Sequence, residues 1–175
     1  MNRLMSGLLM ATGLVLSPAT VYAEDNQALI EQARSAAPSM VSADATVMYQ
    51  GKVLAEGSNG WTCMPETLPG DNSPICNDAV WMKMLTAVGS KGPFETNQMG
   101  FSYMLGGDGG VSNSDPYHSD PMNAEDFIKE GPHLMVIAPK AMIDGMTTDP
   151  HAGGPYVMWK DTPYAHIMIP VGERD

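Results

Sequence analysis

The chain has 175 residues and a formal net charge of −11, with 9 basic against 20 acidic side chains. Nucleic acids and anionic lipid surfaces are bound through clustered Lys and Arg, so this balance predicts no nucleic-acid partner. An acidic surface favours cations, and it also keeps an exported protein in solution.

The first residues, "MNRLMSGLLMATGLVLSPATVYA", join one positive charge at Arg3 to an uncharged stretch and a small-residue end at Ala23. This layout is typical of a cleavable secretory signal, and the apolar stretch is shorter than the roughly 20 residues that span a bilayer. We therefore predict a signal peptide over 1–23, a single globular domain over 24–175 and a periplasmic or secreted location. An uncleaved N-terminal anchor is the alternative. No later stretch is apolar enough to span a membrane after signal cleavage.

The strand and turn signals along the chain predict a β-rich fold. After a short helix over 24–38, three strands are expected over 45–49, 52–56 and 61–64. Asn59-Gly60 favours a tight hairpin between the last two, and hence a β-meander. The two cysteines, Cys63 and Cys76, stand in "TCMPETLPGDNSPICND" and predict a disulfide in an oxidising compartment, because they lack the close spacing of a metal site.

The segment "NDAVWMKMLTAVG" predicts a second helix, with Asn77 as its N-cap, Gly89 as its stop and Trp81 on its apolar stripe. A strand at 99–105, a long loop and a helical turn within 123–130 are expected next. Three further strands are predicted over 133–138, 156–159 and 164–169. Strands outnumber helices without βαβ alternation, so the fold class is α+β: a mainly antiparallel sheet or sandwich with one or two packed helices.

Two of these strands carry the same pattern, a histidine two residues before a methionine: His133/Met135 and His166/Met168. Their apolar flanks predict strands buried on both faces. Period-two spacing puts each pair on one face of its strand, so neighbouring strands would bring the four side chains together. Imidazole and thioether suit copper, and Cu(I) in particular. The alternative is that each histidine bonds a backbone carbonyl beside a packing methionine, as buried polar groups do.

Methionine is frequent overall, at 16 residues against 3 Phe, and most of these thioethers are expected to fill the core. A second set of candidate ligands, suited to chemically hard metal ions, lies between 106 and 126. Its members share carboxylate, amide or imidazole groups that suit Ca²⁺, or zinc if His151 joins them: Asp108, Asn113, Asp115, His118, Asp120, Glu125 and Asp126. The alternative is a solvated loop whose Asp side chains set turns.

Neither a nucleophile elbow nor an H-E-x-x-H motif is present, so no hydrolase signature stands out. An aromatic surface over 155–164 is a third kind of site, suited to a sugar or peptide.

The segments "GWTCMP", "SPICND", "GPHLMV" and "GPYVMWKDTPYAHIMIP" resemble a group of small exported bacterial proteins of uncharacterised function, over most of the chain from about Ala45 onward. The resemblance implies one recurring domain type and transfers no activity. The sequence thus favours an exported binding protein, with copper held by His133, Met135, His166 and Met168. The alternatives are a metal-free module that binds a small molecule or a protein, and a metal-assisted hydrolase that uses the Asp-rich loop.

Overall fold

The computed structural model describes residues 18–174, and most of the predicted signal segment, 1–17, lies outside them. The remainder of that segment, with the predicted cleavage position after Ala23, lies within helix α1. The helices are α1 (Pro18–Arg34), α2 (Ser39–Ser42), α3 (Ala79–Ser90) and α4 (Lys140–Ile143), with a 3-10 turn η1 (Pro121–Asn123). The strands are β1 (Thr46–Tyr49), β2 (Lys52–Ala55), β3 (Thr62–Met64), β4 (Ile75–Asn77), β5 (Gly100–Met104), β6 (Val111–Ser112), β7 (Phe127–Ile128), β8 (His133–Ile137), β9 (Tyr156–Met158) and β10 (His166–Pro170).

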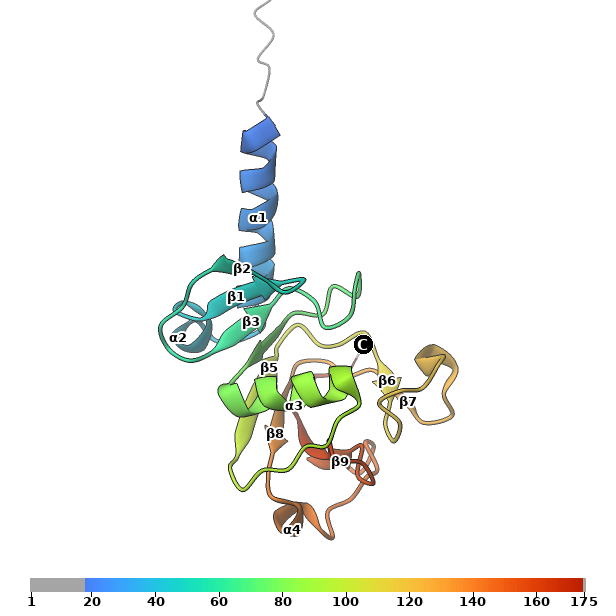
Figure 1. Ribbon diagram of the computed structural model, residues 1–175. Helices are drawn as coiled ribbons and strands as arrows, with labels where there is room; N and C mark the ends of the chain where they lie inside the picture. The colour runs from blue at the N-terminus through green and yellow to red at the C-terminus, as the bar shows by residue number, and fades with distance from the viewer. Residues whose placement is uncertain (1–17, 175) are drawn as a thin grey trace, which may run out of the picture.

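Eight of the strands form one sheet in the order β2-β1-β3-β4-β5-β8-β10-β9, and β6 and β7 form a separate pair (Figure 1). Every neighbouring pair in the large sheet is antiparallel except β1 and β3, which run parallel. The predicted α+β class with a mainly antiparallel sheet is confirmed. No helix in residues 18–174 has the length and apolar character to cross a membrane.

The predicted meander is wrong at its third strand. Gln50 and Gly51 make the hairpin turn between β1 and β2, with φ of 48° and 76°. The chain then crosses back, and β3 pairs with the far side of β1. Gly57 allows this crossing, because a Cβ there would lie 2.1 Å from the backbone nitrogen of Thr46. Asn59 makes no hairpin, since its Nδ2 donates to the carbonyl of Val41 at 2.7 Å.

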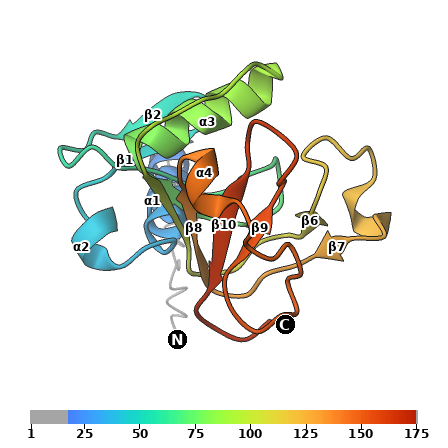
Figure 2. The ribbon, with the colours of Figure 1, turned by 90° about the horizontal axis from the view of Figure 1, so that it is seen from below.

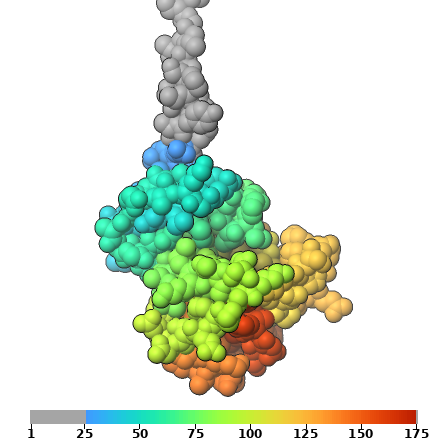
Figure 3. Space-filling model, viewed as in Figure 1, coloured from blue at the N-terminus to red at the C-terminus, as the bar shows by residue number. Residues whose placement is uncertain are grey.

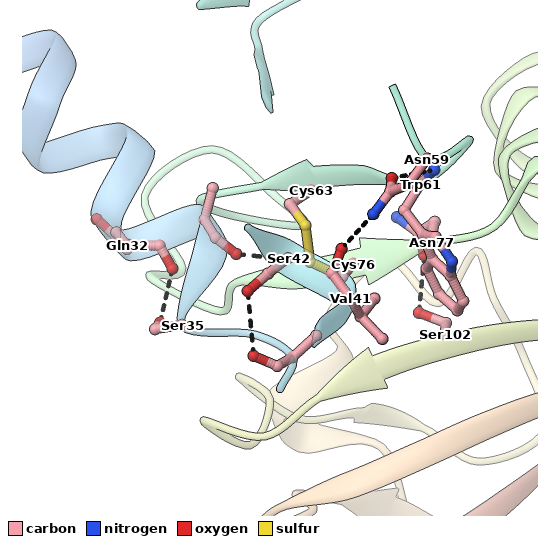
Figure 4. The surroundings of a disulfide bond; sticks show 12 residues. Gln32, Ser35, Val41, Ser42, Asn59, Trp61, Cys63, Cys76, Asn77 and Ser102 are labelled. Atoms are coloured by element: carbon pink, nitrogen blue, oxygen red, sulfur yellow. Dashed lines mark hydrogen bonds between the residues drawn. A yellow bond between two sulfur atoms is a disulfide. The ribbon is translucent and has the colours of Figure 1, made fainter. Parts of the chain in front are cut away.

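The disulfide joins directly opposed residues of β3 and β4, Cys63 and Cys76, whose Cα atoms are 4.0 Å apart. Both cysteines are fully buried among Ala33 of α1 and Val47 of β1, and Trp61 packs against the same cluster (Figure 4). The predicted disulfide is therefore confirmed. It links β3 to β4 on the sheet face that α1 covers.

Helix α3 covers the other face of the sheet, where Trp81 and Met84 pack as predicted for an apolar stripe (Figure 2). Its N-cap is Asp78, and the prediction of Asn77 is wrong. Asn77 still belongs to β4, where its Oδ1 accepts a hydrogen bond from Ser102 Oγ at 2.7 Å. Asp78 Oδ1 accepts from the backbone nitrogens of Val80 and Trp81 at 3.0 and 2.8 Å.

Two other predicted ends differ from the structure. Helix α3 passes Gly89 and ends at Ser90, because Lys91 takes the left-handed conformation with φ of 53° and closes the helix. The first helix ends at Arg34, well before Pro38. The helical turn predicted within 123–130 is wrong as well. Its middle forms strand β7, which pairs with β6, and the only helical residues nearby are those of η1.

Removal of the disulfide by a Cys63→Ala/Cys76→Ala double substitution is expected to lower the free energy of unfolding. The 13-residue separation of the cysteines corresponds to about 3 kcal/mol in the chain-entropy treatment of loop closure. Urea unfolding of the oxidised wild type and the double variant measures the difference, and reduced wild type should match the variant. A difference below about 1 kcal/mol would contradict the expected role of this crosslink.

Substitution Asp78→Ala is expected to cost about 1–2 kcal/mol of unfolding free energy, because the cap of α3 is lost. The cost should reach the upper end, since Asp78 Oδ2 also accepts from the backbone nitrogen of Phe101 at 2.7 Å and so joins α3 to β5. Thermal unfolding checks this, with Asp78→Asn as the matched variant that keeps an acceptor oxygen. Equal losses in the two variants would show that charge, and not capping, is what matters.

Candidate functional site

Strands β8 and β10 are neighbours in the sheet, and they carry all four predicted ligands. Met135 lies directly opposite Met168, and His133 lies opposite Pro170. Because side chains alternate along a strand, this antiparallel register places the histidines and methionines of both strands on one face. That face is the one covered by α3, since Met135 and Met168 pack in the same cluster as Trp81 and Met84.

The same register puts the methionines side by side and the histidines apart. His166 lies four positions along β10 from Pro170, the partner of His133. At about 3.3 Å per residue this offset is roughly 13 Å between backbone positions. Each histidine is next to the methionine of its own strand and diagonal to the methionine of the other, a separation of roughly 7–8 Å. The arrangement is two overlapping sets, each with both methionines and one histidine.

His133 has no exposed surface, and its two ring nitrogens differ in their contacts. Nδ1 lies 2.7 Å from the carbonyl oxygen of Gly131 and donates to it. Nε2 is buried and has no hydrogen-bond partner. The carbonyl fixes the tautomer with the proton on Nδ1, which leaves the lone pair of Nε2 free, as a metal-binding imidazole requires. An unsatisfied buried acceptor costs about 1–3 kcal/mol, so this atom calls for an explanation.

His166 repeats the Nδ1 contact in a different environment. Its Nδ1 donates to the carbonyl of Tyr164 at 2.9 Å. The rings of Trp81 and Trp159 stand edge-on to the imidazole, with centroids 5.2 and 5.1 Å away. Burial among these rings lowers the pKa of His166 to about 4, against a weaker opposite effect of the Tyr164 carbonyl. The imidazole is therefore neutral at neutral pH and needs no deprotonation before it binds a metal.

A polar cluster that the sequence did not predict lies beside the His133 end. Glu130 is 1 % exposed, and its Oε1 accepts from Tyr156 Oη at 2.7 Å. Arg174 forms a bidentate ion pair with the same carboxylate, with Nε–Oε2 and Nη2–Oε1 distances of 2.9 and 2.6 Å. A charged residue three positions before an apolar strand, "EGPHLMV", is the signal that predicts a buried pair, but it does not identify the partner.

Asp108 adds a second carboxylate to this cluster. It accepts from the backbone nitrogen of Glu130 at 3.0 Å, so it is tied to the segment before β8. Burial raises the pKa of Asp108, and the nearby imidazole of His133 works in the opposite direction. The His133 end of the site is thus polar, with the carboxylate of Glu130 paired to Arg174, whereas the His166 end is aromatic.

The acidic loop does not gather into a metal site in the structure. Asp115 and Asp120 accept hydrogen bonds within local turns, from Tyr117 N and Asn123 Nδ2, and Asp126 accepts from Ser114 N, twelve residues away. Asn113 bonds the carbonyl of Thr148, and His118 and Glu125 are exposed. This part of the chain stands out at the side of α3 (Figure 3, yellow to orange). Within residues 18–174, no three His, Cys, Asp or Glu side chains are grouped to hold a metal ion.

The aromatic surface predicted over 155–164 is also wrong, because its rings point inward. Tyr156 and Tyr164 are 0 % and 3 % exposed. Tyr164 Oη donates to the carbonyl of Gly92 at 2.7 Å and so anchors the chain that follows α3. These aromatic residues hold the core together and do not form a binding groove.

Comparisons of the chain with protein-family models, curated proteins and solved structures gave no match. What the site can bind is therefore inferred from its geometry alone.

The neutral state of His166 predicts a specific loss of stability in acid. Its pKa in the folded protein is about 4, below the ordinary value near 6.5 that it regains on unfolding. Protons then bind the unfolded chain first, so the unfolding free energy should fall by up to ~1.4 kcal/mol per pH unit between 6.5 and 4. Urea unfolding at several pH values measures this slope. A His166→Phe variant should lose that part of the slope, and an unchanged slope would contradict the assignment.

Proposed function

We propose that this protein is an exported binding protein that takes a soft metal ion, with Cu(I) as the first candidate, between β8 and β10. The observation that carries the proposal is the register in which Met135 faces Met168, with His133 and His166 on the same face. Two thioethers and one imidazole form a soft ligand set that suits Cu(I) and disfavours hard cations such as Mg²⁺ and Ca²⁺.

The histidines favour this proposal because both are in the state that a metal requires. Each uses Nδ1 to bond a backbone carbonyl, at 2.7 Å in His133 and 2.9 Å in His166. This second contact orients the ring and leaves Nε2 as the ligand atom, an arrangement common around metal-binding histidines. The unpartnered Nε2 of His133 gains a partner when a metal binds.

The four-residue offset makes a three-ligand site the arrangement that we propose. One ion binds both methionines together with either His133 or His166, and the flexible thioethers adapt to the choice. The polar surroundings of His133 favour a positive ion, because Asp108 lies close to it and the paired carboxylate of Glu130 is at the same end of the site. We therefore propose Met135, Met168 and His133 as the preferred set.

The disulfide and the acidic composition fit an exported location. A buried disulfide persists in oxidising compartments, and the predicted signal segment leads to the periplasm or the exterior. A net charge of −11 raises the local concentration of cations.

A metal-free binding module is the second candidate, favoured by an open pocket of about 500 Å³. Residues from two loops line it: Pro150, His151, Gly153, Gly154, Pro170, Gly172, Glu173 and Arg174. A small ligand seated there would leave the methionines without a role beyond packing.

A Met135→Leu/Met168→Leu variant separates the two candidates. Leucine keeps the volume and apolar character of methionine but lacks the thioether, so folding should be retained while Cu(I) affinity falls at least a hundredfold. Anaerobic titration against a chromophoric Cu(I) chelator measures the affinity. Substitution His133→Ala should reduce affinity about tenfold and His166→Ala less, because one histidine set remains in each case.

Met146→Leu is the matched control, since this methionine packs with Ile143 and Val157 in a separate cluster. It should bind Cu(I) within threefold of wild type. If wild type binds no more tightly than the double methionine variant, the proposed metal function is wrong and the metal-free module becomes the better explanation.

A further inference from the structure

The segment that follows β10, residues 171–174, runs along the chain just before β8. The backbone nitrogens of Val171 and Gly172 donate to the carbonyl of Pro132, at 2.8 and 3.1 Å. Gly131 faces this segment so closely that a Cβ there would lie 1.8 Å from the carbonyl oxygen of Glu173. Residues 171–174, which we call the clasp, thus close over the segment that leads into His133.

Arg174 holds the end of the clasp through its ion pair with Glu130. The side chain of Arg174 is 27 % exposed and that of Glu130 only 1 %, so the guanidinium is the solvent-facing member of the pair. Arg174 also donates to the carbonyl of Pro150, which ties the clasp to the neighbouring loop. If Arg174 leaves, the carboxylate of Glu130 is left as a buried negative charge whose remaining side-chain partner is Tyr156.

The pocket of about 500 Å³ lies beside the clasp, with Pro170, Gly172 and Arg174 in its wall. Pro170 is the register partner of His133 on the adjacent strand. One strand spacing, roughly 4.8 Å, therefore separates the backbone at the pocket wall from the backbone of His133. The register thus connects this pocket to one of the predicted ligands.

We propose that the clasp is a movable cover, and that a soft metal ion enters from this pocket when Arg174 separates from Glu130. The carboxylate that Arg174 releases attracts the incoming cation, which passes His151 in the pocket wall, and the unpartnered Nε2 of His133 is the first of the proposed ligands that it meets. The ion then passes to Met135 and Met168. The identity of the ion depends on the proposed function, whereas the opening of the clasp does not.

Chemical labelling of histidine tests the opening without any metal. Diethyl pyrocarbonate modifies the free nitrogen of a neutral imidazole, and mass spectrometry reports each of the four histidines separately. In the wild type, exposed His118 should react quickly while buried His133 and His166 stay protected. In Arg174→Ala, His133 should react at least tenfold faster relative to His118, with His166 unchanged. Unchanged labelling of His133, or an equal rise in both buried histidines, would overturn the proposal.

A second variant controls for a general loss of stability, which could occur in Arg174→Ala because Glu130 is left buried without its cation. In Glu130→Gln/Arg174→Gln the buried charge is absent, and the amide can still accept from Tyr156. The same selective rise at His133 is expected there. Lys129→Ala removes an exposed positive charge next to Glu130 and should leave the labelling pattern of the wild type.

The rate of metal loading tests the route. Stopped-flow transfer of Cu(I) from a chromophoric chelator should be about tenfold faster in Arg174→Ala, with the equilibrium affinity within threefold of wild type. A normal affinity with an unchanged rate would overturn the entry route and leave the proposed function intact. Absence of equilibrium binding in the wild type would overturn both the metal function and the route, and the labelling of His133 would still decide whether the clasp opens.

Discussion

The antiparallel register between β8 and β10 is the constraint on which the candidate site depends. It places Met135 opposite Met168 and turns both histidines toward α3. A slip of β10 by one residue would move His166 and Met168 to the opposite face, next to the cluster around Ile143 and Val157. Burial holds the register in place, because the face with the methionines is buried and the opposite face is partly buried. The backbone positions of Met135 and Met168 are therefore fixed by the packing of the core, whereas their thioether side chains remain flexible.

The sequence correctly predicted the features that depend on residues close together in the chain. The period of two put His133 and Met135 on one face, and the apolar flanks placed their strand inside the sheet. The predicted turns were wrong where a residue far away in the sequence determines the conformation. Asn59 bonds the carbonyl of Val41 and so leads the chain across β1, and Glu130 is paired with a residue 44 positions away. Neither partner is visible in a short stretch of sequence, and the offset between the histidines depends on a register that only the folded sheet defines.

The two ends of the site differ in a way that the shared His-x-Met pattern hides. His133 lies beside a polar cluster in which Asp108 is hydrogen-bonded to the backbone of Glu130 and Glu130 is paired with Arg174. His166 lies between Trp81 and Trp159, which shield it from water and keep it neutral. Two copies of one short motif have thus acquired different electrostatic environments from the residues that surround them. The two His-x-Met segments therefore differ in chemistry although their sequences are alike.

Strand β10 follows both β8 and β9 in the chain, yet it lies between them in the sheet. A chain that is made from its N-terminus can pair β1 to β5 before the later strands are available. The gap beside β8 stays open until His166 to Pro170 arrive. The edge of β8 that carries Met135 is therefore paired only when the last strand of the sheet is complete.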